Sequence, residues 1–454
     1  MDLFEKIAAL AKRRGFIFPS SEIYGGMANT WDFGPVGVLL KNNIRDLWWK
    51  HYVLDRDDMV GIEAATILKP EVWQASGHIG GFNDALIDCK ECKNRVRADH
   101  LIENNFPDKK VEGLPYEELD KIIKENKLKC PKCSVFNWTK VRKFNQLVEV
   151  KLGTLEDEKN LAHLRGEIAQ GIFLNFKNVI DTTRVKIPFG IAQQGKAYRN
   201  EITMGQFVHR TFEFDLMEFE YFIKPETWKN VFEDFRKDMW DWAISLGIKK
   251  ENLKWREHEE LERSFYSKKT MDIEYRYPFG WKEMFGIAYR TDYDLRNHSE
   301  KSGKDLSYLD PITNEKYIPH VVEPTFGLSR LVGILLFDAY SEDGERIVLE
   351  LNPKIAPYKV AVFPLLANKP ELVEKAKDIY HTLKETGLSV TFDSRGNIGK
   401  RYFAQDEIGT PWCVTVDFDT LEDKKVTVRD RDTAKQERVD VDKLVSYFHN
   451  EIGF

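Results

Sequence analysis

The sequence predicts an α+β fold: a mainly antiparallel sheet flanked by helices, interrupted by an inserted module and followed by a separate α/β domain. Between residues 144 and 340, runs such as GIFLNF, GKAYRNEITMG, RTFEFDLMEFEYFI and MDIEYRYPFGW alternate with turn residues, which is typical of strands joined by hairpins. Beyond residue 353 strand-like and helix-like segments alternate, which favours parallel strands. A chain of 454 residues is long enough for about three such units.

The first helix of the sheet domain is entered through Gly34-Pro35. Apolar residues recur at helical spacing and form one stripe, made by Val36, Leu40, Ile44 and Leu47. Two further helices are expected at 228–245 and 328–339.

The segment 86–142 differs in composition from its surroundings, and we interpret it as an inserted module. It contains a lysine-rich helix candidate at 116–129 and two CxxC pairs, Cys89 with Cys92 and Cys130 with Cys133. Two such pairs are typical of a tetrahedral Zn²⁺ site; the alternative is a group of buried thiols without metal. With only Cys413 left over, the cysteines indicate a reducing compartment rather than a disulfide framework.

The last domain is expected to begin between residues 350 and 357. Strands are predicted in KVAVFPL, LSVTFD and PWCVTVDF, and helices at 372–384 and near 399–408. The result is an α/β unit with parallel strands.

Composition narrows the classes of function. A net charge of −6 excludes a generally basic nucleic-acid coat but leaves local basic faces open. The longest apolar stretches, such as 331–337, are too short for a membrane span. The N-terminus lacks a signal-peptide pattern, so we expect a cytoplasmic protein. Because no GxxxxGK[ST] or GxGxxG fingerprint is present, any nucleotide is held in another way.

Three segments carry residues suited to nucleotide chemistry. Arg199 and Glu201 are two apart in a predicted strand and so share one face; an exposed ion pair is the alternative. In the next strand Phe214, Leu216, Glu218 and Glu220 share a face, either in a central strand or as solvated acids on an edge strand.

The third segment leads from Glu323 to Arg330 at the start of an apolar helix. A helix N-terminus and a guanidinium attract the same anion, so this segment suits phosphate binding. The alternative is a solvated arginine at a helix start.

In this order the Gly-Pro helix, the two strands and the third segment resemble motifs 1, 2 and 3 of the class II aminoacyl-tRNA synthetases. More closely, the chain resembles the homodimeric type of glycyl-tRNA synthetase across six segments, including HLRGEIAQGIFLNF, DIEYRYPFGWKEMFGIAYRTDYDL and IPHVVEPTFGLSR. The resemblance implies a class II catalytic domain at 1–85 and 143–350, a zinc-ribbon-like insertion at 86–142 and an anticodon-binding α/β domain at 355–454.

The same resemblance implies roles for individual residues. Arg199 would bind the α-phosphate of ATP, Phe214 would stack on adenine and Arg330 would bind the γ-phosphate. The catalytic set would be Arg199, Arg330 and Glu283. The ATP-binding set would be Arg199, Asn200, Glu201, His209, Arg210, Thr211, Phe212, Glu213, Phe214, Glu283, Met284, Gly327, Leu328, Ser329 and Arg330, with Glu201 on the adenine amino group. The amino-acid set would be Arg97, Glu167, Phe214, Asp215, Leu216, Met217, Glu218, Arg290, Glu323, Pro324, Thr325, Phe326 and Gly327.

The resemblance also implies partners and cofactors. The enzyme would use ATP with Mg²⁺, for which Glu283 and Glu323 are candidate ligands, and would carry a structural Zn²⁺. It would act as a homodimer that activates glycine and transfers it to the 3′ end of tRNA(Gly), with the anticodon on the C-terminal domain. The basic residues best placed there are Arg395, Lys400 and Arg401.

Two other readings stay open. One is a nucleic-acid-binding accessory protein of synthetase fold, but it would be free to lose the ATP-binding residues that this chain keeps. The other is a class II enzyme for proline or threonine, although DIEYRYPFGW and TDYDL resemble the glycyl type. The chain departs from the commonest family pattern at Gly166, Ile168, Leu216, Tyr289 and Thr325.

Overall fold

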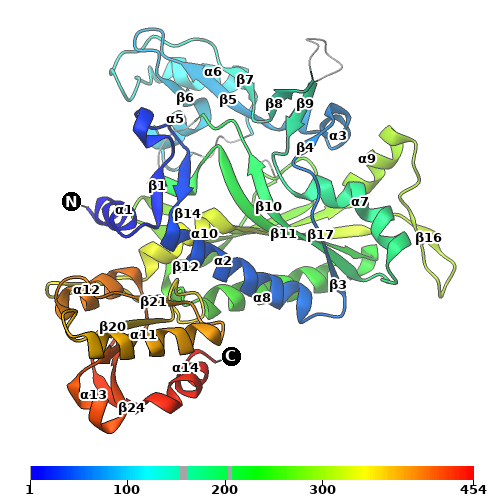
Figure 1. The fold of residues 1–454 in the computed structure, drawn as a ribbon. Helices are drawn as coiled ribbons and strands as arrows, with labels where there is room; N and C mark the ends of the chain where they lie inside the picture. Colours follow the sequence, from blue (N-terminus) through cyan, green and yellow to red (C-terminus); the bar gives the residue numbers. More distant parts are fainter. Residues whose placement is uncertain are drawn as a thin grey trace.

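A seven-stranded sheet forms the centre of the computed structural model, which describes residues 2–109, 111, 113–153, 161–202, 207–260 and 262–453 (Figure 1). Its order is β12-β13-β14-β17-β11-β10-β3. Every neighbouring pair is antiparallel except β10 with β3, so the expected mainly antiparallel sheet is confirmed. The strands are β3 (Met59–Ile62), β10 (Phe189–Tyr198), β11 (Glu213–Ile223), β12 (Leu253–Glu257), β13 (Lys269–Tyr277), β14 (Gly280–Thr291) and β17 (His320–Gly327).

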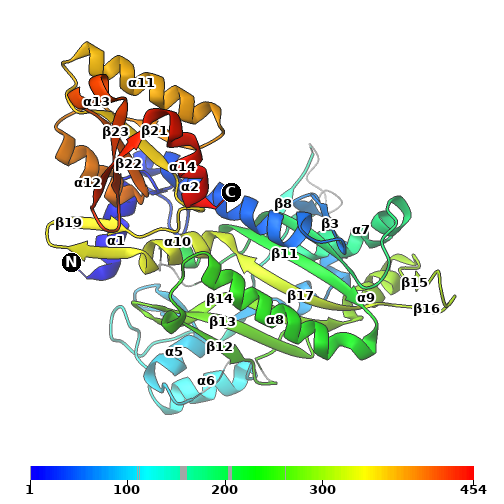
Figure 2. The ribbon, with the colours of Figure 1, turned by 90° about the horizontal axis from the view of Figure 1, so that it is seen from below.

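The central strand β11 is buried on both faces. Met217, Phe219 and Tyr221 point into the main core together with residues of the helices α1 (Leu3–Arg13), α2 (Pro35–Trp49), α8 (Trp228–Ser245) and α10 (Leu328–Asp338). Phe222 points to the opposite face, where α7 (Ala169–Thr182) and α9 (Tyr293–Ser302) complete a second core. The alternative of solvated acids on an edge strand is therefore wrong. Helix α8 runs along one face of the sheet (Figure 2).

The helix predictions at 228–245 and 328–339 are confirmed to within one residue. The run GIFLNF, in contrast, was expected as a strand and is wrong, because it lies inside α7. The buried residues of α7 recur at the spacing of a helix face rather than in alternation. They are Ala169, Ile172, Phe173, Phe176 and Val179.

The helix after Gly34 is fixed at its start by a close approach of two backbones. The amides of Val36 and Gly37 both donate to the carbonyl of Gly15, at 3.0 and 3.2 Å, so two of the unpaired amides at a helix N-terminus find a partner. Of the predicted stripe, Val36, Leu40 and Ile44 are buried within the chain, but Leu47 is only partly buried and Trp48 takes the fourth core position.

The inserted segment forms a small sheet with its own apolar core. The order β6-β5-β7 joins β6 (Arg95–Arg97), β5 (Asn83–Asp88) and β7 (Arg142–Asn145). Helices α5 (Ala98–Asn105) and α6 (Tyr116–Glu125) supply much of the rest of this core. The lysine-rich helix ends at Glu125 rather than at 129, since Lys127 has a positive φ of 47°, which a right-handed helix does not allow.

Smaller elements join these units. A second three-stranded sheet has the order β4-β9-β8, and short hairpins β1-β2, β15-β16 and β18-β19 border the main sheet. These elements are β1 (Ile17–Pro19), β2 (Trp31–Phe33), β4 (Ile67–Leu68), α3 (Pro70–Ala75), α4 (His78–Gly81), β8 (Val148–Lys151), β9 (Leu161–Leu164), β15 (Tyr308–Leu309), β16 (Lys316–Tyr317), β18 (Tyr340–Asp343) and β19 (Arg346–Leu349).

The C-terminal sheet has the order β21-β20-β22-β23-β24. The first three strands are parallel, but β22 pairs antiparallel with β23, and β23 with β24. The expectation of parallel strands is thus correct only for the strand-helix-strand part, because β23 and β24 follow without a long helical crossover. The elements are β20 (Val360–Pro364), α11 (Pro370–Glu385), β21 (Val390–Phe392), α12 (Ile398–Ile408), β22 (Trp412–Val416), α13 (Phe418–Asp423), β23 (Lys425–Asp430), β24 (Gln436–Asp440) and α14 (Leu444–Ile452).

A buried ion cluster joins the C-terminal domain to the rest of the chain. Asp406 is fully buried and accepts two hydrogen bonds from Arg429, at 2.8 and 3.0 Å. Arg346, from the β18-β19 hairpin, approaches the same carboxylate at 3.4 Å. The two views show the insertion and the C-terminal domain on opposite sides of the central sheet (Figures 1 and 2).

Among the residues that the structure describes, none of the helices has the length and apolar character needed to cross a bilayer.

We predict that Gly37→Ala destabilises the protein. A Cβ at this position would lie 1.9 Å from the carbonyl oxygen of Phe16, so the backbone must shift, at a cost of about 1–3 kcal/mol. Gly80→Ala is the matched control, because its Cβ would meet nothing within 4 Å. Thermal melting of the two variants should show a lower midpoint for Gly37→Ala alone; equal midpoints would contradict the tight contact.

Candidate active site

A cavity opens on the face of β11 that α7 leaves uncovered. The even-numbered residues of β11 face this side, and α7 packs over the Phe222 end only, so Phe214, Leu216 and Glu218 line the cavity. The other walls come from β14, β17 and the first turn of α10. The cavity collects these predicted residues: Glu167, Arg199, Glu201, His209, Arg210, Thr211, Phe214, Asp215, Leu216, Glu218, Glu283, Glu323, Thr325, Gly327, Ser329 and Arg330.

One end of the cavity is rich in guanidinium groups. Arg330 lies in the first turn of α10, where its Nη1 is 2.8 Å from the carboxylate of Glu283 and its Nε donates to the His209 carbonyl at 3.2 Å. Arg199 donates to the carbonyl of Gly166 at 2.9 Å and lies over the ring of Phe214, 5.3 Å from its centroid. Such an end is suited to a polyphosphate anion.

Arg199 and Glu201 were expected within a strand, but β10 ends at Tyr198. Their shared face therefore does not come from strand alternation. The chain instead leaves the sheet while the Arg199 amide still bonds the carbonyl of Phe212, at 2.9 Å. Glu201 pairs with Arg210 at 3.6 Å, and one of its carboxylate oxygens is buried without a hydrogen-bond partner among the described residues.

The deep end of the cavity holds a group of buried acids around one arginine. Arg290 has no exposed side-chain surface and contacts Glu323 at 2.7 Å, Asp294 at 2.8 Å and Glu167 at 3.4 Å. Glu218, Glu220 and Glu323 have carboxylate oxygens within 4.8 Å of one another. Three acids thus contact the guanidinium, and Glu218 and Glu220 lie beside one of them, Glu323.

Charge in this group is unevenly distributed. Burial raises the pKa of Glu218 well above its usual range, and the charges of Glu323 and Glu167 add to the effect. Burial also raises the pKa of Glu323, to about 7, although Arg290 opposes the shift. Burial would raise the pKa of Glu167 as well, but the charges of His78 and Arg290 outweigh it and lower that pKa. The raised pKa values favour the neutral acids, whereas an ammonium group among them would favour their charged forms. Carboxylate oxygens of Glu218 and Glu220 that have no hydrogen-bond partner among the described residues could accept from such a group.

Strand alternation keeps several predicted residues out of the cavity. The side chains of Met217, Met284, Phe326 and Leu328 point into the main core, and Pro324 is buried between cavity-facing neighbours. These residues can reach a ligand only through their backbone. Phe212 and Glu213 lie before the cavity-facing part of β11, where Glu213 pairs with Lys196.

Asn200 and Arg97 are also placed away from the cavity. Asn200 lines a separate hollow with residues of β7, β8 and β9. Arg97 lies in the insertion, where it pairs with Asp84 at 3.0 Å and with Asp99 at 2.5 Å. The resemblance implied that Arg97 lies near the amino acid, but its side chain is paired within the small sheet and helix of the insertion, which has its own core.

The two candidate Mg²⁺ ligands do not lie together. Ala288 of β14 pairs with Glu323 of β17, and Glu283 lies five residues away along β14, roughly 17 Å at about 3.4 Å per residue. One ion cannot bind both. Of the two, only Glu283 lies beside the arginine of α10.

His209 lies in the cavity wall with its ring against Tyr277. Burial lowers its pKa to about 2, and the charges of Arg330, Arg210 and Lys282 act in the same direction. The ring is therefore neutral and can contact a nucleotide only as a neutral group.

The sequence interpretation missed several residues of the site. Gln170 donates to Glu167 at 2.8 Å and to Asp294 at 2.9 Å, and His78 lies 3.1 Å from Glu167. The Tyr266 ring covers Arg290, with 3.8 Å between the guanidinium carbon and the ring centroid. Apart from Gln170 with Glu167, which are three residues apart, these contacts join segments that are distant in the sequence, so no local pattern could have identified them.

Ile168 and Leu216, where the chain departs from the common pattern, belong to one small apolar cluster with Ala197, and Phe214 packs against it. The two departures are thus neighbours in space. Together they make the cavity wall beside Phe214 apolar.

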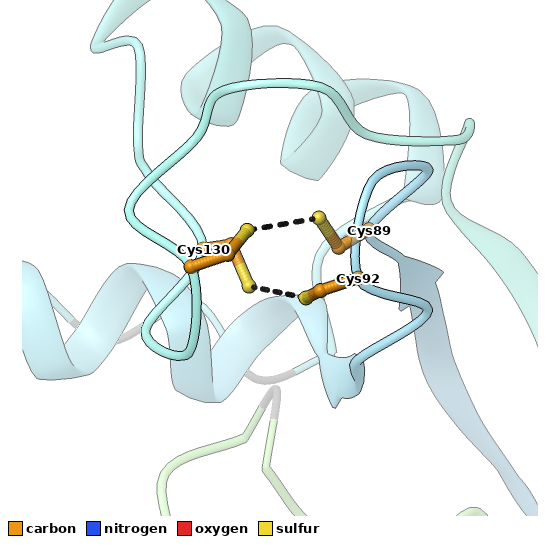
Figure 3. Close-up of side chains that lie close together, drawn as sticks. Cys89, Cys92 and Cys130 are labelled. Atoms are coloured by element: carbon orange, nitrogen blue, oxygen red, sulfur yellow. Dashed lines mark hydrogen bonds between the residues drawn. The ribbon is translucent and has the colours of Figure 1, made fainter.

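The four clustered cysteines come from two loops with the same hydrogen-bond pattern. In the first loop the amide of Lys93 donates to the Cys89 carbonyl and the Cys89 amide to the Asn94 carbonyl; in the second, Ser134, Cys130 and Val135 repeat this arrangement. Lys93 and Ser134 both have a positive φ. The loops face each other, and Figure 3 shows Cys89 and Cys92 on one and Cys130 on the other.

The sulfur positions fit one tetrahedral ion. Cys89 and Cys133 have Sγ atoms 3.6 Å apart, as do Cys92 and Cys130. A tetrahedral ion with Zn–S bonds of about 2.3 Å would separate its sulfurs by about 3.8 Å. Burial raises the pKa of Cys130, but the amides of Cys133 and Lys132 outweigh it and lower the pKa to about 7, which favours a thiolate ligand.

Of the basic residues expected to contact an anticodon, Arg401 is not available. It is buried and donates to the carbonyls of Pro364 and Leu365, so it stabilises its own domain. Arg395 and Lys400 are exposed.

Comparisons with known proteins give a match to a domain family and matches to whole chains. Residues 359–451 match the family described as the anticodon binding domain. Over 99% of its length the chain is 52% identical to the glycine–tRNA ligases of Caldanaerobacter subterraneus subsp. tengcongensis, Clostridium tetani and Acetivibrio thermocellus, and it covers 98% of each.

We predict that Arg290→Met destabilises the fold strongly at neutral pH. The substitution leaves buried carboxylates without their cation, which typically costs about 3–5 kcal/mol. In the variant the folded-state pKa values of these acids rise above their unfolded values, so the folded state binds more protons and the loss should shrink as the pH falls.

Thermal melting at pH 7.5 and at pH 5.5 tests this prediction. Arg395→Met is the control, because that side chain is 93% exposed and should not change the midpoint at either pH. A variant that melts like the parent at pH 7.5 would show that Arg290 is not required for stability.

Proposed function

The chain belongs to the glycine–tRNA ligases, and we infer that it activates glycine with ATP and transfers it to the 3′ end of tRNA(Gly). The identity of 52% over almost the full length of several relatives carries this conclusion. The enzyme is an ATP-dependent aminoacyl-tRNA ligase that forms AMP and diphosphate. Its partners are glycine, ATP and tRNA.

We propose that the two ends of the cavity hold the two substrates of activation. The polyphosphate of ATP would lie at the end with Arg199, Arg210 and Arg330, and adenine against Phe214 and Glu201. The glycine ammonium would lie at the acidic end, among Glu167, Glu218 and Glu323. The carboxylate of glycine can then attack the α-phosphate in line, and diphosphate leaves from the arginine end.

The residues of the chain contribute position and charge. Charge develops on the phosphoryl oxygens during the displacement, and fixed guanidinium groups stabilise it without a covalent intermediate on the enzyme. Glu283 holds Arg330 at 2.8 Å and is the carboxylate that could also bind the Mg²⁺ of ATP. Glycyl-adenylate then reacts with the ribose hydroxyl at the tRNA end, and AMP is released.

Glycine selectivity would come from lack of space. Thr325 donates to Glu218 at 3.4 Å and faces the same cavity, so the acids that bind the ammonium are crowded by a β-branched side chain. Every competing amino acid has a side chain to place there, and steric exclusion removes the need for editing.

We propose three functional regions. Residues 1–85 and 143–350 would catalyse both steps, 86–142 would lie near the tRNA acceptor end, and 355–454 would bind the anticodon. The match of residues 359–451 to the anticodon binding domain supports the last assignment. Among the basic residues first considered, Arg395 and Lys400 remain candidates for contacts with tRNA.

We also propose that the enzyme is a homodimer. The resemblance implies this state, but the apolar stripe of α2 is used inside the chain and adds no support. Better support comes from the loop before β2, where Ile23 is 87% exposed, Tyr24 88% and Met27 56%. Three large apolar side chains on one exposed loop are typical of a protein interface.

The zinc assignment rests on the four thiolates and the matching loops. The ion would have no open coordination position, so its role would be structural. The segment between the two CxxC pairs contains α5 and α6, and the ion would close it at both ends.

An amino-acid panel in ATP–diphosphate exchange tests the function. Glycine should support exchange, and alanine and serine should not. Arg330→Ala should reduce exchange with glycine by a factor on the order of 10² or more, the scale expected for a preorganised electrostatic contact. Equal rates with alanine and glycine would refute the selectivity, and near-normal exchange in folded Arg330→Ala would refute the phosphate contact.

Metal analysis of purified protein should find about one zinc per chain, since the four thiolates form a single site. Cys89→Ser should lose the ion, whereas Cys413→Ala, which changes a buried cysteine of the C-terminal sheet, should retain it. Zinc-free parent protein with unchanged melting and charging activity would show that the cysteines only pack.

A further inference from the structure

A histidine and an aspartate outside the sets assigned above form a bonded pair in the wall of the cavity. His258 follows β12 and Asp272 lies in β13, and both line the cavity. The Nε2 of His258 is 2.6 Å from the Oδ2 of Asp272. The His258 amide donates to the Thr270 carbonyl at 3.0 Å, which extends the β12-β13 pairing by one residue and fixes the backbone of His258.

Within the described part of the chain, the second nitrogen of the ring has no hydrogen-bond partner. Burial raises the pKa of Asp272 to about 6, although the hydrogen bond to His258 opposes the shift, so the carboxylate is mostly ionised at pH 7. An ionised carboxylate only accepts hydrogen bonds, so Nε2 carries the proton that bonds to Asp272. Nδ1 is buried and has no hydrogen-bond partner among the residues that the structure describes. A buried polar group without a partner costs about 1–3 kcal/mol, which a ligand in the cavity would relieve.

The charges around His258 favour a cationic ring. Burial lowers its pKa, but the hydrogen bond to Asp272 and the charges of Asp272 and Glu283 outweigh burial and the opposing charge of Arg256, so the pKa is raised. An imidazolium has an N–H at both positions, and its Nδ1–H can donate to an anion.

The position of the pair indicates which part of ATP it would contact. Glu283, whose charge acts on His258, belongs to β14 and is bonded to Arg330. Phe214 and Glu201, proposed to bind adenine, come instead from β11 and the chain beyond β10. With the polyphosphate at the arginine end as proposed, the β- and γ-phosphates are the groups of ATP that we expect nearest to the ring of His258, although its backbone lies in the row of Ala288 and Glu323.

We propose that His258 donates a hydrogen bond from Nδ1 to the β- or γ-phosphate of ATP, and that Asp272 is a positioning residue that orients the ring. This assignment rests on the proposed function, because it takes ATP as the substrate in the cavity. A cationic His258 would be a fourth positive side chain in the cavity, after Arg199, Arg210 and Arg330. The neighbouring titratable groups on its own side of the cavity, Asp272 and Glu283, are acids.

The test is His258→Gln in the full chain, with dissociation constants measured for ATP and for AMP and with KM values for ATP and glycine in diphosphate exchange. Loss of one charge-assisted hydrogen bond should raise the ATP constants by about tenfold, which corresponds to about 1.4 kcal/mol. AMP lacks the β- and γ-phosphates, so its dissociation constant should change less than about twofold, and the KM for glycine should not change. Asp272→Asn should raise the ATP constants less than His258→Gln, because the ring keeps a hydrogen-bond partner but loses the carboxylate.

Arg256→Gln is the matched control. Arg256 lies two residues before His258 and contacts Glu262 at 2.6 Å and Glu274 at 4.0 Å, but it does not line the cavity. Because the charge of Arg256 opposes a proton on His258, this variant should bind ATP as tightly as the parent or slightly more tightly. An equal loss of ATP affinity in Arg256→Gln would show that any change near β12 perturbs the site, and would overturn the proposal.

Three further results would overturn it. Folded His258→Gln that binds ATP like the parent would exclude the contact, equal weakening for AMP and ATP would exclude the terminal phosphates, and a loss larger in Asp272→Asn than in His258→Gln would exclude the positioning role. A parent protein that neither binds ATP nor supports exchange with any amino acid would refute the proposed function itself, a result distinct from these three.

Discussion

Burial of the Arg290 guanidinium is the constraint on which the rest of the site depends. The carboxylates that it contacts come from three different segments: Glu167 before α7, Asp294 in α9 and Glu323 in β17. Acids this close would repel one another in a medium of low dielectric constant if no cation lay between them. The ring of Tyr266 covers the guanidinium, so water does not replace the protein contacts. An acidic pocket can therefore exist at the end of a hydrophobic sheet.

The position of the cavity follows from how the two faces of β11 are covered. One face is buried along its length by α2, α8 and α10, and the other is covered by α7 only near Phe222. Because side chains alternate along a strand, the uncovered face presents Phe214, Leu216 and Glu218 as a set. A stacking surface for a base, Phe214, and an acid for an amine, Glu218, thus lie four residues apart on one strand.

Much of this could be predicted from local patterns, and the limits are physical. Helix α8 matched its predicted bounds because its apolar residues have one clear period. The run GIFLNF did not, since a short apolar run fits a strand or a buried helix until its longer spacing is considered. Arg401 looked like an exposed cation in the sequence, but its partners are backbone carbonyls 36 and 37 residues away. Contacts such as His78 with Glu167 join distant segments and leave no local signal.

The buried link between Asp406, Arg429 and Arg346 has a consequence for how a long substrate is recognised. Two of its members belong to the C-terminal domain and the third to the hairpin that follows α10, and its position out of water makes it costly to rearrange. If the C-terminal sheet binds the anticodon as proposed, this link fixes the distance between the anticodon-binding surface and the catalytic cavity. The enzyme then selects tRNA by its overall length and bend. An RNA of different length or bend would fail to reach both sites even if its anticodon were correct.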